Sequence, residues 1–339
     1  MTTQKPYRVA IIGAGAIGCY VGTRLAAAGC DVTFLGRVWL QQAAQDGGLS
    51  AQTMDGDHVV LASGLANVVT TIADVGIADV YLVCTKSDDT ATAAAELASI
   101  LKPTTGTQAN VVSLQNGLDN TAVLQAHLAS AKVHPGMVAF NVVSRGTMSF
   151  AATTEGGIHL PDNTVGRTLA PHLQNAGIDC SLHDDMQAVQ FAKLILNLNN
   201  ALNALSGLPL VEELSDPRWR RVLAACMDEA LDVAEALGIK PARIVKAPVG
   251  LIPTILRLPT FLFTRVAAQM LKVDPAARSS MAEDFDKGRR PEIDHLNGKI
   301  VQLGQTVGVA TPVNERVTNA VLKCFEGKTA RPLDPLTLV

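Results

Sequence analysis

A glycine-rich turn near the N-terminus has the residue types and spacing that suit a phosphate ligand. Gly13, Gly15 and Gly18 form a GxGxxG pattern between the apolar run 8–12 and a helical pattern that continues to Ala28. The three glycines suit a tight turn, the approach of a pyrophosphate and close helix–strand packing, and Ala16 and Ile17 at the helix start offer free N–H groups. The pattern alone also occurs in ordinary turns, but its position between strand and helix predicts a dinucleotide site.

Arg37 predicts which dinucleotide binds. The second expected strand, 31–35, is followed by Gly36 and Arg37, with no acidic residue to accept hydrogen bonds from a ribose 2′-hydroxyl. A guanidinium suits a 2′-phosphate through paired hydrogen bonds. We therefore predict NADP(H), the alternative being that Arg37 is a solvated loop residue.

Two further strand ends carry polar side chains. Lys86 follows the run 79–84, and Asn116 follows the run 110–114. Ligands of open α/β sheets bind beyond the carboxyl ends of the strands, so both side chains are candidate ligands of cofactor or substrate. Each also has an ordinary explanation, because Lys86 suits a solvated loop and Asn116 before a glycine suits a turn.

A lysine lies in the most apolar helical pattern of the second half, 186–205. At ~100° per residue, Lys193, Asn197 and Asn200 share one narrow face, whereas Asn203 falls off it and is expected to be structural. Burial lowers the pKa of a lysine, which makes it a competent proton donor near neutral pH. The alternative is that Lys193 packs its stem and keeps its amine in solvent.

Candidate partners of this lysine follow later in the chain. Ser280 precedes the run Pro291-Glu-Ile-Asp-His-Leu-Asn-Gly298 by about ten residues. Pro291 predicts the start of a helix over 291–307, which puts Glu292 in its first turn, where a carboxylate also favours the helix dipole.

The order of the elements predicts two domains. Strand and helix patterns alternate up to about residue 182, which indicates α/β structure with a parallel sheet, and extra strands are expected between 133 and 160. Long helical patterns follow at 186–205, 216–237, 291–307 and 312–325. We place the boundary near Asp184, giving domains 1–184 and 185–339.

Composition excludes several classes of protein. The 339 residues carry a formal net charge of −3, which argues against a nucleic-acid partner. The six cysteines are far apart and the seven histidines scattered, so no metal site is expected. No apolar run is long enough to span a membrane, and we expect a cytoplasmic protein. Only 17% of residues are charged, which allows surface to be buried between subunits in a homodimer.

The ordered set of motifs resembles the ketopantoate reductase family over nearly the whole chain. The motifs are GAGAIG at 13–18, Arg37, CTK ending at Lys86, QNG at 115–117, KLILN at 193–197 and SSM at 279–281, followed by PEIDHLNG. The resemblance implies an N-terminal Rossmann domain and an all-helical C-terminal domain like that of 6-phosphogluconate dehydrogenase, with the active site in the cleft between them.

The resemblance also implies roles for the matching residues. Lys193 corresponds to the lysine that protonates the ketone while NADPH delivers hydride, and Glu292 to the glutamate that positions substrate beside it. Asn116 and Asn197 correspond to substrate-binding asparagines, Asn116 also lying near the nicotinamide. Ser280 corresponds to the serine that binds the substrate carboxylate, and Lys86 to a lysine of the cofactor site.

Two departures from the family pattern bear on the substrate. The family's second asparagine falls at Ala201, and Asn200 is the candidate substitute. The stretch 247–273 is also longer and more apolar than in simple members, and we expect it to be buried, as a partial wall of the pocket or as a dimer contact. The leading prediction is reduction of 2-dehydropantoate to pantoate. The alternatives are a bulkier or differently branched 2-keto acid and a non-catalytic NADPH sensor.

Overall fold

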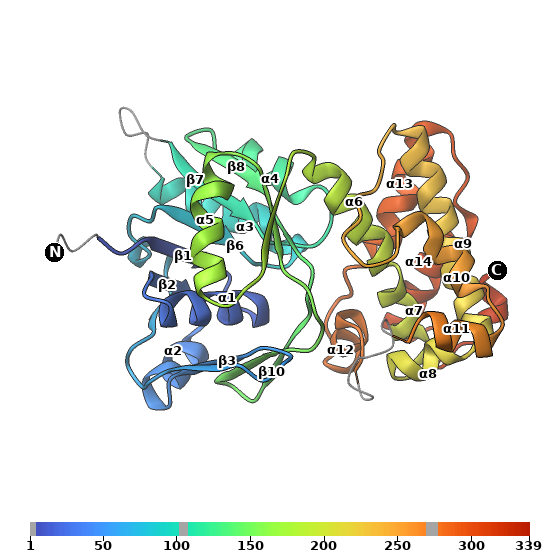
Figure 1. Cartoon of the computed structure of the whole chain (residues 1–339), viewed down its shortest axis with the longest axis horizontal. Helices are drawn as coiled ribbons and strands as arrows, with labels where there is room; N and C mark the ends of the chain where they lie inside the picture. Colours follow the sequence, from blue (N-terminus) through green and yellow to red (C-terminus); the bar gives the residue numbers. More distant parts are fainter. Residues whose placement is uncertain (1–4, 102–107, 269–276) are drawn as a thin grey trace. The chain divides into compact units, whose positions relative to one another are not determined.

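The chain forms two compact units, Met1–Met186 and Gln187–Val339, in a computed structural model (Figure 1). The structure describes residues 5–101, 108–268 and 277–339. The division falls at the start of helix α6 (Met186–Asn197). Each unit is described in turn.

Unit 1 is built on a six-stranded parallel sheet. Its order is β5-β2-β1-β6-β7-β8, so the chain runs outward in one direction from β1 and then restarts at β6 on the other side of β1. The strands are β1 (Arg8–Ile12), β2 (Asp31–Leu35), β5 (Asn67–Val69), β6 (Val80–Val83), β7 (Ala109–Ser113) and β8 (Ala131–Pro135). This is the Rossmann order, and its switch point lies between β1 and β6.

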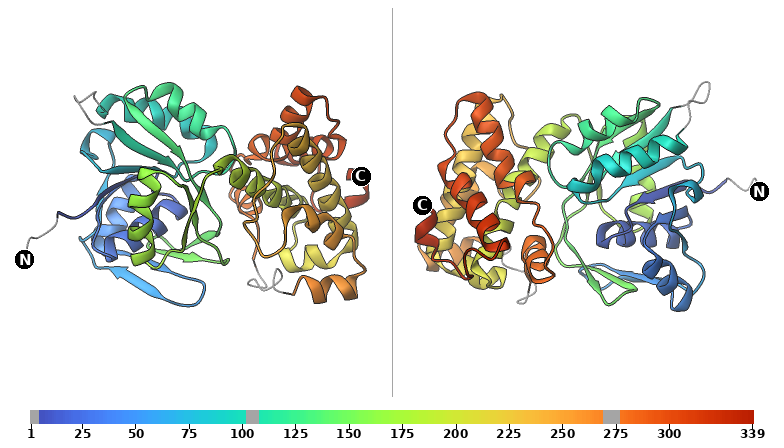
Figure 2. Two further views of the ribbon diagram at one scale, coloured as in Figure 1. Left: turned by 45° about the horizontal axis from the view of Figure 1, so that its top comes forward. Right: turned by 180° about the vertical axis from the view of Figure 1, so that it is seen from behind.

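Helices cover both faces of this sheet because alternate residues of β1 enter two different cores. Val9 and Ile11 pack in one core with α1 (Ala16–Ala27) and α5 (Thr164–Asn175). Ala10 and Ile12 pack in the other with α3 (Thr90–Ile100) and α4 (Asn120–His127). Helix α5 lies in front of the sheet in Figure 1, and the opposite face is seen from behind in Figure 2.

Two smaller sheets complete unit 1, where the sequence predicted extra strands. One has the order β10-β11-β3-β4 and the other β13-β12-β9. Their strands are β3 (Leu49–Gln52), β4 (His58–Leu61), β9 (Met137–Val138), β10 (Val142–Arg145), β11 (Ser149–Ala152), β12 (Ile158–Pro161) and β13 (Cys180–His183). The sequence did not single out β3, β4, β5 or helix α2 (Val38–Asp46).

Unit 2 is helical throughout its described residues. The 20-residue helix α9 (Pro217–Ala236) is its centre and packs against α8 (Leu210–Ser215), α10 (Ile252–Leu256), α13 (Asn297–Val307) and α14 (Pro312–Phe325). The other described helices are α6, α7 (Asn199–Ser206), α11 (Thr260–Val266) and α12 (Ser280–Asp286). None of the described helices is long and apolar enough to cross a membrane.

Two helix predictions in unit 2 are wrong in detail. The pattern 186–205 is two helices, because the chain breaks at Leu198, whose N–H bonds to the oxygen of Ile195 three residues back, at 3.3 Å. Pro291 does not start an α-helix. A 3₁₀ turn covers Ile293–His295, and α13 begins only at Asn297, because Leu296 adopts a non-helical backbone (φ −115°, ψ −101°).

The apolar stretch 247–273 is only partly buried. Ile252, Leu256 and Phe263 are in the core, but Phe261 is 71% exposed. Leu251 and Val266 are also exposed in the single chain, so their burial, as a pocket wall or as a dimer contact, stays a prediction. Prolines divide it as expected, with Pro259 directly before α11. Its end beyond residue 268 lies outside the described residues.

Candidate active site

The glycine loop has the geometry of a dinucleotide cradle. Gly13 has φ +92°, and a Cβ there would lie 2.5 Å from Cγ2 of Thr85. A Cβ on Gly18 would lie 2.6 Å from the Gly13 carbonyl oxygen and 2.8 Å from Ile11 on β1, so this glycine permits the close helix–strand contact. Nothing lies within 4 Å of a Cβ on Gly15. The open space at Gly15, in front of the α1 N-terminus, fits a pyrophosphate.

Arg37 lies at the end of β2, beside this loop in the sheet. It is exposed, and it begins α2 from an extended backbone (φ −85°, ψ 159°). The Ala14 N–H donates to the Leu35 carbonyl at 2.9 Å, which ties the glycine loop to this strand end. Arg37 therefore follows the strand end to which the glycine loop is bonded.

Lys86 and Asn116 lie on neighbouring loops that a buried network joins. Lys86 follows β6 and is half-buried, and Asn116 follows β7 and is exposed. The Ser87 hydroxyl donates to the Asn116 carbonyl at 3.1 Å. Because Gly13 contacts Thr85, the structure brings the glycine loop, Lys86 and Asn116 to one edge of the sheet.

Gln115 is the centre of that network, and sequence reasoning assigned it no role. It is 6% exposed, and its amide Nε2 donates to the Thr85 carbonyl at 3.1 Å and to the Thr90 hydroxyl at 2.7 Å. The Thr90 hydroxyl in turn donates to Oδ1 of Asn120, whose Nδ2 donates to the Asn116 carbonyl at 2.5 Å. These side chains fix the loops that carry Lys86 and Asn116. The signal was the polar Gln115 directly after an apolar strand.

Lys193 and Asn197 lie one turn apart on α6 in unit 2. Burial lowers the pKa of Lys193 from 10.5 to about 8. Asn197 is buried, and the neighbouring Leu194 and Ile195 belong to the core. Lys193 is half-buried, and the lowered pKa has the direction expected from the helix pattern, whereas its role as proton donor stays a prediction.

Asn200 and Ser280 are linked through the α12 N-terminus. Asn200 lies beyond the break, at the second residue of α7, and is half-buried, and the face that it is expected to share with Lys193 stays a prediction. Its carbonyl accepts the Ser279 hydroxyl at 3.0 Å. Ser279 is buried and its hydroxyl caps α12 by accepting the Ala282 N–H at 3.1 Å, which leaves Ser280, the first helical residue, with an exposed side chain.

Glu292 precedes the 3₁₀ turn rather than lying in an α-helical first turn. It is half-buried, and its carbonyl accepts the His295 N–H at 3.1 Å. The helix-dipole explanation for this carboxylate therefore loses its basis. The turn packs against α13 and α14, and α14 also packs against α7.

A buried network fixes the segment after Glu292, and the sequence gave no reason to expect it. Asn297 donates to Oδ1 of Asn314 at 3.0 Å, and Nδ2 of Asn314 donates to Glu229 at 2.7 Å. The Glu229 carboxylate also accepts the Val313 and Asn314 N–H groups at 2.7 and 2.9 Å, which caps α14. Within the described residues no group of three or more His, Cys, Asp or Glu side chains could hold a metal ion.

Comparison with known proteins identifies the family. The N-terminal sequence model of ketopantoate reductase PanE/ApbA matches residues 9–165, and the C-terminal model of the same family matches residues 185–324. The chain belongs to the ketopantoate reductase family. It is therefore an oxidoreductase of a nicotinamide-dependent family.

Relatives cover nearly the whole chain. A 2-dehydropantoate 2-reductase of Halobacterium salinarum is 29% identical, covering 93% of this chain and 97% of its own. The crystal structure of a PanE/ApbA family ketopantoate reductase from Ralstonia eutropha is 31% identical with a TM-score of 0.79, over 95% of this chain and 99% of its own. A D-mandelate dehydrogenase solved with NADH and anilino(oxo)acetate, 21% identical with a TM-score of 0.76, shares the fold.

Proposed function

We propose that this protein reduces 2-dehydropantoate to pantoate with NADPH. The observation that carries the proposal is Lys193, a lysine with its pKa lowered to about 8 on an apolar helix, one turn from the buried Asn197, in a member of this family. Full-length relatives named 2-dehydropantoate 2-reductase support the choice of substrate.

The chemistry assigns one role to each unit. NADPH, when bound at the glycine loop of unit 1, supplies the hydride that the keto carbon accepts. The Lys193 ammonium donates a proton to the keto oxygen, which becomes the hydroxyl of the product, and the neutral amine then regains a proton from water. Unit 1 is thus the NADP-binding domain, and unit 2 is the substrate and dimerisation domain.

The other site residues hold the substrate in this scheme. Asn116, Asn197 and Asn200 offer amides to its polar groups, and Ser280 donates a hydrogen bond to its carboxylate. Glu292 accepts hydrogen bonds and orients substrate and lysine. Lys86 adds positive charge to the cofactor site, beside the N–H groups of Ala16, Ile17 and Gly18.

The preference for NADPH rests on Arg37. The side chain is exposed at the end of β2, the following Val38 carries no charge, and no acidic residue follows the strand. The alternative cofactor is NADH, with which the D-mandelate dehydrogenase was crystallised. A 2′-phosphate gives the guanidinium a charged acceptor that NADH lacks.

A second candidate function is reduction of a different branched or bulkier 2-keto acid. Ala201, where the family has an asparagine, and the long apolar stretch 247–273 favour it. A non-catalytic NADPH sensor is a third candidate, but it has no use for Lys193 and Glu292.

One experiment tests these candidates together. The purified protein is assayed for oxidation of NADPH and of NADH across a panel of 2-keto acids that includes 2-dehydropantoate. The proposal requires the highest kcat/KM with 2-dehydropantoate and NADPH. A higher value with another keto acid favours the second candidate, and NADPH binding without turnover favours the sensor.

A further inference from the structure

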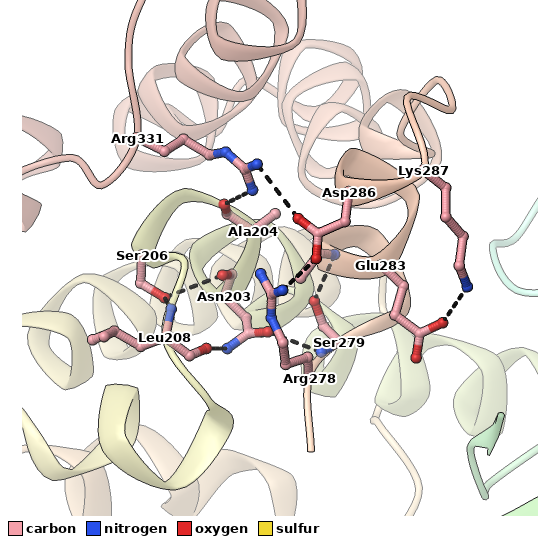
Figure 3. Close-up of polar contacts among 11 residues, drawn as sticks. Asn203, Ala204, Ser206, Leu208, Arg278, Ser279, Glu283, Asp286, Lys287 and Arg331 are labelled. Atoms are coloured by element: carbon pink, nitrogen blue, oxygen red, sulfur yellow. Dashed lines mark hydrogen bonds and ion pairs between the residues drawn. The ribbon is translucent and has the colours of Figure 1, made fainter. Parts of the chain in front are cut away.

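A buried asparagine holds the segment that carries Ser280. Asn203 on α7 is fully buried, and its side-chain Oδ1 accepts the backbone N–H of Ser279 at 2.8 Å (Figure 3). This contact joins residues 76 positions apart and lies directly before the first residue of α12.

The orientation of the Asn203 amide is fixed from its other side. Its Nδ2 donates to the Leu208 carbonyl at 2.9 Å and to Oε2 of Glu213 at 2.5 Å. Both groups accept hydrogen bonds from the nitrogen, so the oxygen must face Ser279. Glu213 is itself fully buried, and its second oxygen has no partner in the described structure. The proposed mechanism does not use this carboxyl group. Its contribution is the hydrogen bond that it accepts from the Asn203 amide.

The C-terminal end of α12 is linked to Ala204, the residue of α7 that follows Asn203, through Arg331. Arg331 donates to the Ala204 carbonyl at 3.0 Å, and its guanidinium lies over the Phe285 ring, 4.6 Å from the centroid. Asp286, at the end of α12, pairs with Arg331 at 3.6 Å and with Arg278 (Figure 3). Asn203 therefore bonds to the residue before α12, and Ala204 is linked to the end of α12 through Arg331.

We propose that Asn203 is a positioning residue for substrate binding, which acts through Ser279 to hold the Ser280 hydroxyl toward the carboxylate of the 2-keto acid. This inference rests on the proposed function, because Ser280 binds the carboxylate only in that scheme. Asn203 does not touch substrate. Its loss changes the place of Ser280 and leaves the proton donor on α6 and the glycine loop of unit 1 intact.

The test compares Asn203→Leu with the matched variant Ser206→Ala. Ser206 is buried on the same helix, donates to the Asn203 carbonyl and accepts the Leu208 N–H, but does not touch Ser279. Asn203→Leu should raise KM for the keto acid about tenfold or more, with kcat changed less than threefold and the Kd for NADPH unchanged. Ser206→Ala should lose thermal stability and keep its KM. Equal KM values for Asn203→Leu and wild type would overturn the proposal.

A double-mutant cycle separates positioning from general damage. If Asn203 acts through Ser280, Asn203→Leu combined with Ser280→Ala should raise KM no further than Ser280→Ala alone. Additive effects would show that Asn203 acts elsewhere. Asn203→Asp keeps the oxygen that accepts the Ser279 N–H, so it should retain a KM closer to wild type than the leucine variant, and it serves if the latter does not fold.

Hydrogen exchange gives a reading that needs no substrate. Amide exchange over residues 279–282 should accelerate in Asn203→Leu and not in Ser206→Ala, and unchanged exchange would overturn the positioning role.

The positioning role and the proposed function can fail separately. If wild type fails to reduce 2-dehydropantoate but reduces another keto acid, the proposed function fails, and the KM comparison is repeated on that substrate.

Discussion

Lys193 is the residue on which the proposed chemistry depends. Lys193→Ala should lower kcat by ~10²–10⁴, the usual effect of losing a general acid. The Kd for NADPH should be unchanged, because the glycine loop belongs to unit 1. The exposed Lys323 on α14 offers a control, and Lys323→Ala should keep wild-type kcat. A Lys193→Ala enzyme that turns over at the wild-type rate would show that the lysine is structural.

The lowered pKa of Lys193 gives this reaction a pH limit. The protonated amine is the donor, and its pKa is about 8 rather than 10.5, so the fraction able to donate falls as pH rises through 8. Reduction should therefore slow above about pH 8 in a kcat–pH profile. A profile that stays flat up to pH 10 would contradict the role of Lys193 as proton donor.

Arg37 should separate the two nicotinamide cofactors. Arg37→Ala should weaken NADPH binding by about 1.5–3 kcal/mol, the range for hydrogen bonds to a charged group, and should change NADH binding little. Titration calorimetry or fluorescence with both cofactors measures this. Arg145→Ala, an exposed arginine of the same unit, is the control. Equal losses for NADPH and NADH would rule out recognition of the 2′-phosphate.

Helix α8 carries a buried acid that makes stability depend on pH. Burial raises the pKa of Glu213 from 4.5 to about 8. Between these values the folded protein keeps a proton that the unfolded chain releases, so the free energy of unfolding falls as pH rises from about 5 to 8. Glu213→Gln, which mimics the protonated acid, should flatten this dependence and raise stability at pH 8. Glu212→Gln, at the exposed neighbouring residue, is the control. Its free energy of unfolding in urea should equal that of wild type at about pH 5 and at pH 8.

Arg220 on α9 holds the segment that contains α10 and α11. It is fully buried, and its guanidinium donates to the carbonyls of Leu214, Ser215, Leu256 and Leu258 and to the Thr260 hydroxyl. It also lies 4.3 Å from the centroid of the Phe263 ring. Arg220→Met leaves these acceptors without a hydrogen-bond donor and should lower the free energy of unfolding by at least about 3 kcal/mol. The exposed Arg221, changed to Met, should cost less than about 0.5 kcal/mol in the same urea titration.

Local patterns predicted elements better than they predicted their junctions. The bounds of β1, β2 and α14 agree with the sequence, because apolar runs and a proline at a helix start are local signals. The break at Leu198 and the 3₁₀ turn before α13 were missed, since the residues at which the helical pattern breaks, Leu198 and Leu296, are neither glycine nor proline.

The polar networks around the candidate site could not be derived from the sequence. Gln115, Asn203 and Glu229 each acquire their function from partners brought close only by folding, as the 76-residue separation of Asn203 from Ser279 illustrates. Asn203 was set aside as structural because it lies off the face of Lys193. Its buried contact with the Ser279 N–H agrees with that structural role, but which segment it holds could not be read from the sequence.

At the scale of the whole molecule, the stretch 247–273 exposes several large apolar side chains. Phe261 is 71% exposed on α11, and Leu251 and Val266 are more than half exposed. A contact with a second copy of the chain and a wall of the substrate pocket are the two expected ways to cover Phe261, and a substitution at this residue separates them. Charged residues make up only 17% of the sequence, which agrees with the burial of some surface between two copies of the chain.

The prediction for assembly follows from that exposure. Phe261→Asp should shift the protein toward monomer in sedimentation velocity at micromolar concentration, because a carboxylate in the contact would lose its hydration. Its kcat/KM for 2-keto acids of increasing chain length should keep the wild-type order. The control is Leu336→Asp, at another apolar residue that is more than half exposed, and it should leave the sedimentation coefficient unchanged. If Phe261→Asp sediments like wild type but loses its preference among keto acids, the stretch lines the substrate pocket and the contact between copies lies elsewhere.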